Sequence, residues 1–194
     1  MNRKEALKDK DSLGLYHQIL QLHNDLDAAF LNTFQRSLPL NEEIIDRWER
    51  AQNLGFGKNT SIYNSSFVFG NVKVGSDCWI GPYTVIDGSG DLEIGDHCTI
   101  SVGVHIYSHD SVKHTLSSGR LPIERYNVRI GNNVYIGPNS VIVKGINIGR
   151  NCVIGAFTLV NKDIPDNSIV LGQPGVVRGR VEIRDNNVEF IYNR

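Results

Sequence analysis

The sequence is poor in cysteine, and the few cysteines it has are badly placed for covalent cross-linking. Its three cysteines stand at positions 78, 98 and 152, far apart and without a CxxC pair. An odd number of widely spaced cysteines does not form a disulfide framework. We therefore expect reduced thiols that serve as packing residues.

Long apolar runs and an excess of charge of one sign are also absent. No apolar run approaches membrane-spanning length, and the charged start MNRKEALKDKDS lacks the apolar stretch of a secretory signal. The 20 Lys and Arg residues balance 21 Asp and Glu residues, which indicates neither a nucleic-acid surface nor an anionic membrane surface. We expect a cytoplasmic protein with one sizeable core, no nucleic-acid partner and no membrane insertion.

What the sequence does contain is an aliphatic residue at every sixth position over long stretches. A small or β-branched residue follows four positions after most of these aliphatic residues, and all three cysteines occupy that slot. A step of six fits neither the 3.6-residue period of a helix nor the two-residue period of a strand. It predicts a narrow coil of short parallel strands, with the aliphatic residue on the axis, the small residue at a corner, and glycine or asparagine relaxing the backbone there. The aliphatic positions are Val68, Val74, Ile80 and Ile86, then Ile94, Ile100 and Ile106, then Ile130, Ile136, Ile142, Ile148, Ile154 and Val160.

The hexads IGPYTV, IGDHCT, IGNNVY, IGPNSV, IGRNCV and IGAFTL resemble those of the hexapeptide-repeat acyltransferases, and the chain is similar to the sugar and polysaccharide O-acetyltransferases among them. The resemblance covers roughly residues 56–175. It implies an all-β solenoid, a left-handed parallel β-helix, for which the hexads predict about five coils. It also implies a homotrimer with active sites between neighbouring coils.

The segments on either side of the repeats predict helices before the coil and a β-hairpin after it. Apolar residues at steps of three and four over residues 12–35 predict an amphipathic helix. A second helix is predicted from Asn41 as N-cap, with Arg47 and Arg50 in its last turn. We expect this helical hairpin to cover the N-terminal end of the coil. The expected organisation is an N-terminal helical segment (1–54), a β-helix acyltransferase domain (55–175) with a loop at 107–127, and a C-terminal β-hairpin around DNN (176–194).

The step of six fails at two places. Between Ile86 and Ile94 the spacing is eight, and DGSGD is expected to form a small bulge. Between Ile106 and Ile130 lies the segment YSHDSVKHTLSSGRLPIERYN. Loops of this length in compact domains are usually functional or disordered, so this segment is the first place to look for an active site.

Two of the six histidines, His109 and His114, lie in this loop. Acyl transfer from a thioester to a hydroxyl needs a base near the hydroxyl and donors for the developing oxyanion, and imidazole suits the first role. The resemblance implies that the base is a histidine a few residues into the loop, which VHIYSHD matches at His109. The expected mechanism is direct. His109 removes the proton of the acceptor hydroxyl as that oxygen attacks the acetyl carbonyl of acetyl-CoA, without a covalent acyl-enzyme.

The resemblance also implies a coenzyme A groove along the coil and a small-molecule or glycan acceptor, without a metal ion. Candidate acceptor contacts are Tyr83, Asp87 and His114. Three roles remain open for Asp87: contact with an acceptor hydroxyl, orientation of His109 from a neighbouring subunit, or a plain turn residue. The candidate coenzyme A contacts are Tyr135, Ala156, Asn161, Lys162, Arg178 and Arg180.

Other functions remain open on the sequence alone. The acceptor can be the amine of a nucleotide-linked amino sugar. The spacing of five between His109 and His114 suggests a zinc-dependent β-helical hydratase, although both residues lie off the repeat. The fold also permits a non-catalytic scaffold. Zinc content and coenzyme A binding separate these functions.

Overall fold

The computed structural model describes residues 3–8, 12–185 and 187–193, and the chain divides into two compact units, Met1–Asp46 and Arg47–Arg194. The first unit is helical, with α1 (Arg3–Ala6), α2 (Ser12–Phe34) and α3 (Leu40–Ile44). His23 Nδ1 of α2 lies 2.7 Å from Glu43 Oε2 of α3, and the Glu43 side chain is buried. This contact connects the two helices.

The second predicted helix is broken in two. α3 ends at Ile44, Ile45 is extended, and α4 (Arg47–Asn53) begins two residues later. Pro39, not Asn41, occupies the N-cap position of α3. Arg47 therefore opens a helix instead of lying in a last turn. The prediction of one helix from Asn41 was wrong because the extended Ile45 interrupts the helical hydrogen bonds.

Helix α4 belongs to the second unit and packs on the first turn of the coil. Ala51 is buried, and its carbonyl accepts a hydrogen bond from Phe56 N–H at 3.0 Å. The Arg50 guanidinium donates to the Tyr63 carbonyl and, at 2.7 Å, to the Ser66 carbonyl. These bonds engage carbonyl groups at the edge of the strand stack, where exposed edges are otherwise open to pairing with another chain. For α4, the expected helical cover of this end is confirmed.

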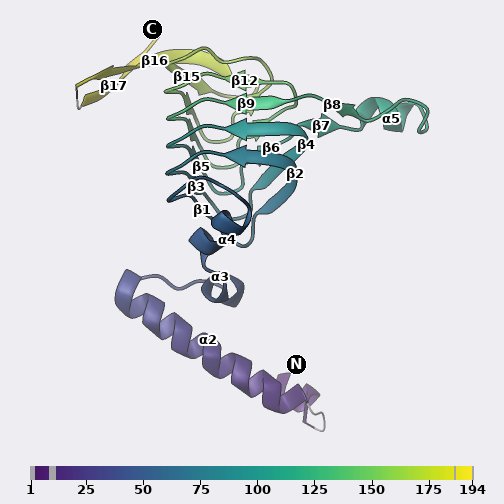
Figure 1. Ribbon diagram of the computed structural model, residues 1–194, viewed down its shortest axis with the longest axis vertical. Coiled ribbons are helices and arrows are strands. Elements are labelled where there is room, and N and C mark those ends of the chain that lie inside the picture. The colour runs from purple at the N-terminus through teal and green to yellow at the C-terminus, as the bar shows by residue number, and fades with distance from the viewer. Residues whose placement is uncertain (1–2, 9–11, 186, 194) are drawn as a thin grey trace. The chain divides into compact units, whose positions relative to one another are not determined.

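The rest of the second unit is a solenoid of about six turns, in which short strands of successive turns stack in parallel (Figure 1). The expected fold class is thus confirmed, with one turn more than the hexads suggested. The extra turn begins after Val160, where Ile164 bridges Ile148 and Val170 pairs with Ile154. One sheet contains β1 (Ser61–Ile62), β3 (Trp79–Ile80), β5 (Thr99–Ile100), β10 (Tyr135–Ile136), β13 (Val153–Ile154) and β15 (Ser168–Leu171). The other contains β2 (Phe67–Val74), β4 (Val85–Ile94), β6 (His105–Ile106), β9 (Val128–Ile130), β11 (Val141–Ile142), β12 (Asn147–Ile148) and β14 (Leu159–Val160).

The aliphatic residue of each hexad fills the axis of the coil. Ile80, Ile100, Ile136 and Ile154 are all fully buried and lie in register on successive turns. The three cysteines are buried free thiols at corner positions. Both the predicted core and the packing role of the cysteines are confirmed.

Glycine and asparagine serve two different purposes at the corners. Positive φ belongs to the residue just before the small one, as at Asn133 (58°), Asn139 (57°) and Asn151 (56°). The glycine after the aliphatic residue is needed instead for close stacking of the turns, because a Cβ on Gly137 would lie 2.6 Å from the backbone nitrogen of Ala156 on the next turn.

Residues 107–127 form an ordered arm. β7 (His109–Asp110) pairs antiparallel with β8 (Glu124–Arg125), and α5 (Val112–Leu116) lies between them. The arm projects from the side of the coil (Figure 1). The sequence suggested a flexible loop here, but its two ends are joined by strand pairing.

The chain ends in the predicted C-terminal hairpin. β16 (Val176–Arg184) pairs antiparallel with β15 of the coil, and β17 (Asn187–Tyr192) pairs antiparallel with β16. The hairpin therefore extends one sheet of its own chain. Asn186, in the predicted turn, lies outside the described residues.

Removing part of the axial stack should destabilise the fold. We expect Ile136→Ala to lower the free energy of unfolding by about 2–5 kcal/mol, because it leaves a cavity between two turns that cannot collapse. Chemical denaturation followed by circular dichroism measures this. Leu116→Ala is the control, since Leu116 is 81% exposed on the arm. Equal losses in the two variants would contradict an axial core.

Candidate active site

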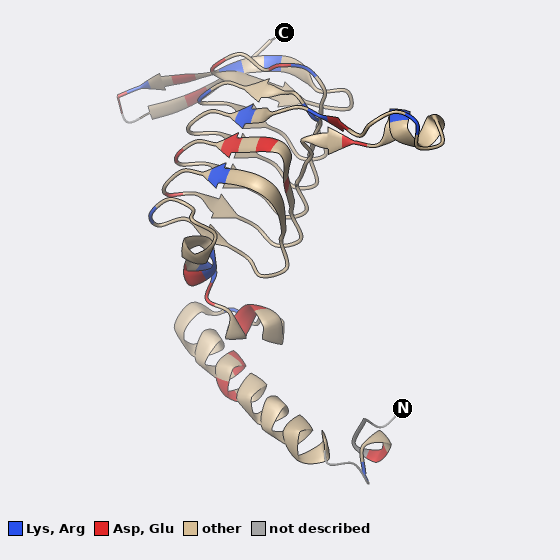
Figure 2. Ribbon diagram, turned by 45° about the vertical axis from the view of Figure 1, so that its right-hand side comes forward, with Lys and Arg blue, Asp and Glu red and all other residues tan. Residues whose placement is uncertain are grey.

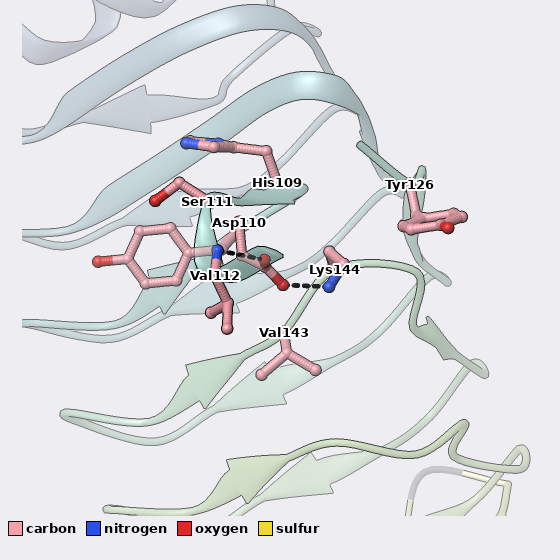
Figure 3. A pocket seen from close by; sticks show the side chains of 8 residues that line it. His109, Asp110, Ser111, Val112, Tyr126, Val143 and Lys144 are labelled. Atoms are coloured by element: carbon pink, nitrogen blue, oxygen red, sulfur yellow. Dashed lines mark hydrogen bonds and ion pairs between the residues drawn. The ribbon is translucent and has the colours of Figure 1, made fainter. Parts of the chain in front are cut away.

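His109 lies at the base of the arm and lines a pocket of about 720 Å³ (Figure 3). The arm supplies most of the wall, and the turn after β11 supplies the rest. The lining residues are Tyr107, His109, Asp110, Ser111, Val112, Tyr126, Val143 and Lys144. The pocket thus forms where the arm leaves the coil.

The two places where the hexad step fails lie next to each other. Ile86 and Ile106 pair in register, so the bulge after Ile86 and the arm after Ile106 start side by side on successive turns. The backbone N–H of Ser108 donates to Asp87 Oδ2 at 2.9 Å, and Gly90 N–H donates to Ser108 Oγ at 2.8 Å. The bulge is therefore the support on which the base of the arm rests.

Asp87 contacts His109 directly. Asp87 Oδ2 lies 2.6 Å from His109 Nδ1, and Asp87 is only 1% exposed. Its other oxygen, Oδ1, accepts the N–H of Ser89 at 3.0 Å, so Asp87 also stabilises the turn. The sequence allowed an orienting contact from a neighbouring subunit. The contact is instead made within one chain.

Hydrogen bonding determines the charge of Asp87. Burial alone would raise its pKa, but hydrogen bonds from Ser89, His109 and the Ser108 backbone outweigh burial and lower the pKa from 3.8 to about 2. An ionised carboxylate only accepts hydrogen bonds, so His109 Nδ1 carries the proton of this pair. In the neutral imidazole, Nε2 then keeps a free lone pair.

Lys113 and Lys144 form ion pairs with acidic residues of the neck of the arm, which we define as the strand pair β7–β8. Lys144 Nζ contacts the carboxylate of Asp110 and lies 3.2 Å from Glu124 Oε2. Lys113 Nζ lies 2.6 Å from Glu124 Oε1. Basic and acidic residues are scattered over the coil, and both signs occur near the neck (Figure 2).

Of the other candidate acceptor contacts, neither lines this pocket. Tyr83 is an exposed corner residue with a φ of 58°. His114 lies in α5, and its Nδ1 is 2.7 Å from the carbonyl oxygen of Leu121, inside the arm. The structure brings together His109 and Asp87 but not Tyr83 or His114.

The candidate coenzyme A residues are spread over several parts of the coil. Asn161 and Lys162 directly follow β14, which pairs with β11, so they lie one turn beyond the pocket residues Val143 and Lys144. The other four lie elsewhere: Tyr135 on β10 beside the C-terminal hairpin, Ala156 in the turn after β13, and Arg178 and Arg180 on β16, with Arg180 paired to Glu182.

Sequence reasoning missed several residues that line the pocket, above all Asp110, Tyr126 and Lys144. A signal for Lys144 was present. It is a single charge in the run VIVKG, two residues after the core position Ile142. Its partners lie far from it in sequence, so the charge alone did not reveal them.

The structure also bears on a metal site and on membrane insertion. Within the described ranges, no three His, Cys, Asp or Glu side chains converge so that they could hold a metal ion. In the same parts of the chain, none of the helices combines the length and the apolar character needed to cross a bilayer.

Comparison with known proteins agrees with this architecture. Residues 127–162 match the family model described as bacterial transferase hexapeptide (six repeats). The galactoside O-acetyltransferase of Escherichia coli (strain K12) is 34% identical over 135 residues, which cover 70% of this chain and 61% of that protein. Protein CapG of Staphylococcus aureus is 40% identical over 107 residues, covering 53% of this chain and 62% of that one. The chain thus spans less than two thirds of either relative.

Solved structures show the same fold. A point mutant of AntD, an N-acyltransferase from Bacillus cereus, in complex with dTDP and coenzyme A matches with a TM-score of 0.57 at 22% identity, over 71% of this chain and 89% of that one. A hexapeptide-repeat acetyltransferase from Vibrio cholerae, complexed with acetyl coenzyme A, matches with a TM-score of 0.52 at 19% identity, over 88% of each chain. The fold and repeats define a hexapeptide-repeat solenoid. In its repeats and its fold the chain is similar to the hexapeptide-repeat β-helix acyltransferases.

The Asp87 carboxylate should make stability depend on pH. Its folded pKa lies below the unfolded value of 3.8, so it stabilises the protein above that pH and loses this effect as the pH falls toward 2. We expect Asp87→Asn to lower stability at neutral pH by about 2 kcal/mol. We also expect its stability curve to be flatter between about pH 4 and 2.

Denaturant titrations across the acid range measure this effect. Asp91→Asn is a matched control from the same bulge, since Asp91 is exposed and accepts one hydrogen bond, from Asn71, that an amide oxygen also accepts. Parallel curves for wild type and Asp87→Asn would contradict an ionised, hydrogen-bonded Asp87.

Proposed function

We propose that this protein is an acetyl-CoA-dependent O-acetyltransferase that acts on a hydroxyl of a sugar or polysaccharide precursor, with His109 as the general base. The observation that carries the proposal is the 2.6 Å contact between Asp87 Oδ2 and His109 Nδ1 beside the pocket. It keeps the proton on Nδ1 and leaves Nε2 free to accept one. Similarity to galactoside O-acetyltransferases supports the same reaction class.

The reaction proceeds by direct transfer. As the acceptor oxygen attacks the acetyl carbonyl carbon, its proton passes to His109 Nε2, and the ionised Asp87 stabilises the imidazolium that forms. A backbone N–H of a coil turn holds the oxyanion. When the carbon–sulfur bond breaks, the imidazolium returns the proton to the thiolate, so the products are an acetyl ester and coenzyme A.

The charges around the pocket favour a neutral acceptor. Lys144, the lysine that lines the pocket, is paired with both Asp110 and Glu124. A nucleotide-linked amino sugar carries a diphosphate, which binds best to unpaired cations and backbone N–H groups. Tyr107 and Tyr126 also line the pocket, and their aromatic rings suit a sugar ring. We therefore place a neutral sugar ahead of an amino sugar linked to a nucleotide.

Coenzyme A would run along the coil past Asn161 and Lys162, the candidates one turn from the pocket. Tyr135, Ala156, Arg178 and Arg180 remain candidate contacts if the cofactor continues over a neighbouring copy. A homotrimer is supported by two apolar outer faces, on which Tyr135 lies beside Val153 and Val141 beside Leu159. A threefold ring uses two different faces of each subunit.

Replacing His109 should separate binding from chemistry. We expect His109→Ala to bind coenzyme A as wild type does in calorimetry but to lose about 10²–10⁴-fold in acetyl-CoA consumption with a panel of neutral sugars and sugar nucleotides. His97→Ala is the control, because His97 is an exposed histidine of the coil. Failure of folded wild-type protein to bind coenzyme A would reject the transferase, and zinc analysis would then test the hydratase.

A further inference from the structure

Lys144 joins the coil to both strands of the arm's neck. It follows β11, whose Ile142 pairs in register with Ile106, the last coil residue before the arm. From this turn, its ammonium group contacts Asp110 in β7 (Figure 3). It also lies 3.2 Å from Glu124 Oε2 in β8. One side chain of the coil therefore holds both ends of the arm.

The neck needs such support for two reasons. Each of its strands has two residues, and so short a pair is marginal in water. Asp110 and Glu124 also stand directly opposite each other in this pair. Like charges at opposed positions repel and destabilise a strand pair. Lys144 lies against both carboxylates and offsets that repulsion.

The ion pair between Lys144 and Glu124 is partly shielded from solvent, so it can contribute to the stability of the neck. The Lys144 and Glu124 side chains are 20% and 19% exposed, so solvent and salt screen them less than surface pairs. The hydrogen bond from Lys144 lowers the pKa of Asp110, and the hydrogen bond to Asp110 raises the pKa of Lys144. Hydrogen bonds from Lys113 and then Lys144 lower the pKa of Glu124. All these groups are therefore charged at neutral pH.

The position of His109 links the neck to the chemistry. His109 precedes Asp110 in β7, and its imidazole bonds to Asp87, which belongs to the coil. If the neck opened, His109 would move relative to Asp87 and to the pocket. We infer that Lys144 is a positioning residue, which clamps the arm to the coil through Asp110 and Glu124 and so fixes His109. This inference rests on the proposed role of His109.

The test compares Lys144→Met, which keeps an unbranched side chain of similar bulk and removes its charge, with Lys144→Arg, which keeps the charge. Hydrogen exchange of the full-length chain without ligands reports on the neck directly. We expect at least tenfold faster exchange over residues 107–127 in Lys144→Met, and near wild-type exchange in Lys144→Arg. Lys58→Met, at an exposed lysine of the first turn, is the control.

Kinetics provides the second readout. We expect Lys144→Met to lower kcat about tenfold or more with little change in coenzyme A affinity, and Lys144→Arg to restore most of kcat. Unchanged exchange of the arm in Lys144→Met, or an arginine variant as impaired as the methionine variant, would overturn the clamp. Exchange needs no turnover, so it tests the clamp even if the proposed transferase activity fails.

Glu124→Gln keeps the inference testable if Lys144→Met does not fold. It removes one of the same contacts from the side of the arm and should also speed exchange over residues 107–127. Where both variants fold, their combination should accelerate exchange less than the product of the two single effects, because the contact is already lost. Independent, multiplicative effects would show that the two side chains do not act together.

Discussion

Every turn of the coil must place its peptide groups beneath those of the next. Ser101 N–H donates to the Ile136 carbonyl at 2.9 Å, and Gly137 N–H donates to the Ile154 carbonyl at 2.7 Å. This ladder requires successive turns to follow the same path, which explains the step of six and the axial isoleucines. It also explains the glycines, because a Cβ at these positions would push neighbouring turns apart. Extra residues can only leave outward at a corner. The chain does this on two successive turns, after Ile86 and after Ile106, and the two departures meet.

The bulge after Ile86 supplies the carboxylate that orients His109 at the base of the arm. A buried carboxylate is costly unless donors surround it. The bulge provides Ser89 N–H for Asp87, and the base of the arm provides Ser108 N–H and the His109 imidazole. Close approach is required as well, since a Cβ on Gly90 would lie 2.5 Å from the Ser108 carbonyl oxygen. The same contacts that make the buried Asp87 tolerable also orient His109, so local stability and the geometry of the base have one cause.

What repeats in the sequence could be predicted, and what departs from the repeat could only be located. Periodicity identified the axial residues and the inward cysteines and located the arm. The choice of His109 within the arm rested on the family resemblance, and its role as the base remains a proposal. It did not show that Asp87 contacts His109 in the same chain, because that contact spans 22 residues between two irregular segments. The contact between Lys144 and Asp110 spans 34 residues, again with one partner off the repeat. The break at Ile45 was missed for a different reason: charges and caps suggested one helix, and the local backbone decided otherwise.

The two sides of the pocket are built from different kinds of structure. Val143 and Lys144 belong to the coil, whose ladder holds them in place, whereas Tyr126, Ser111 and Val112 belong to the arm. Asp87 does not line the pocket, but it also belongs to the coil and contacts His109 from there. Residues on a rigid scaffold keep the proton of His109 on Nδ1, and residues on the arm shape the space that an acceptor would fill. Changes in the arm beyond its neck can therefore alter the acceptor without disturbing the base. A change at the neck should alter both, because there Asp110 and Glu124 adjoin His109, the proposed base.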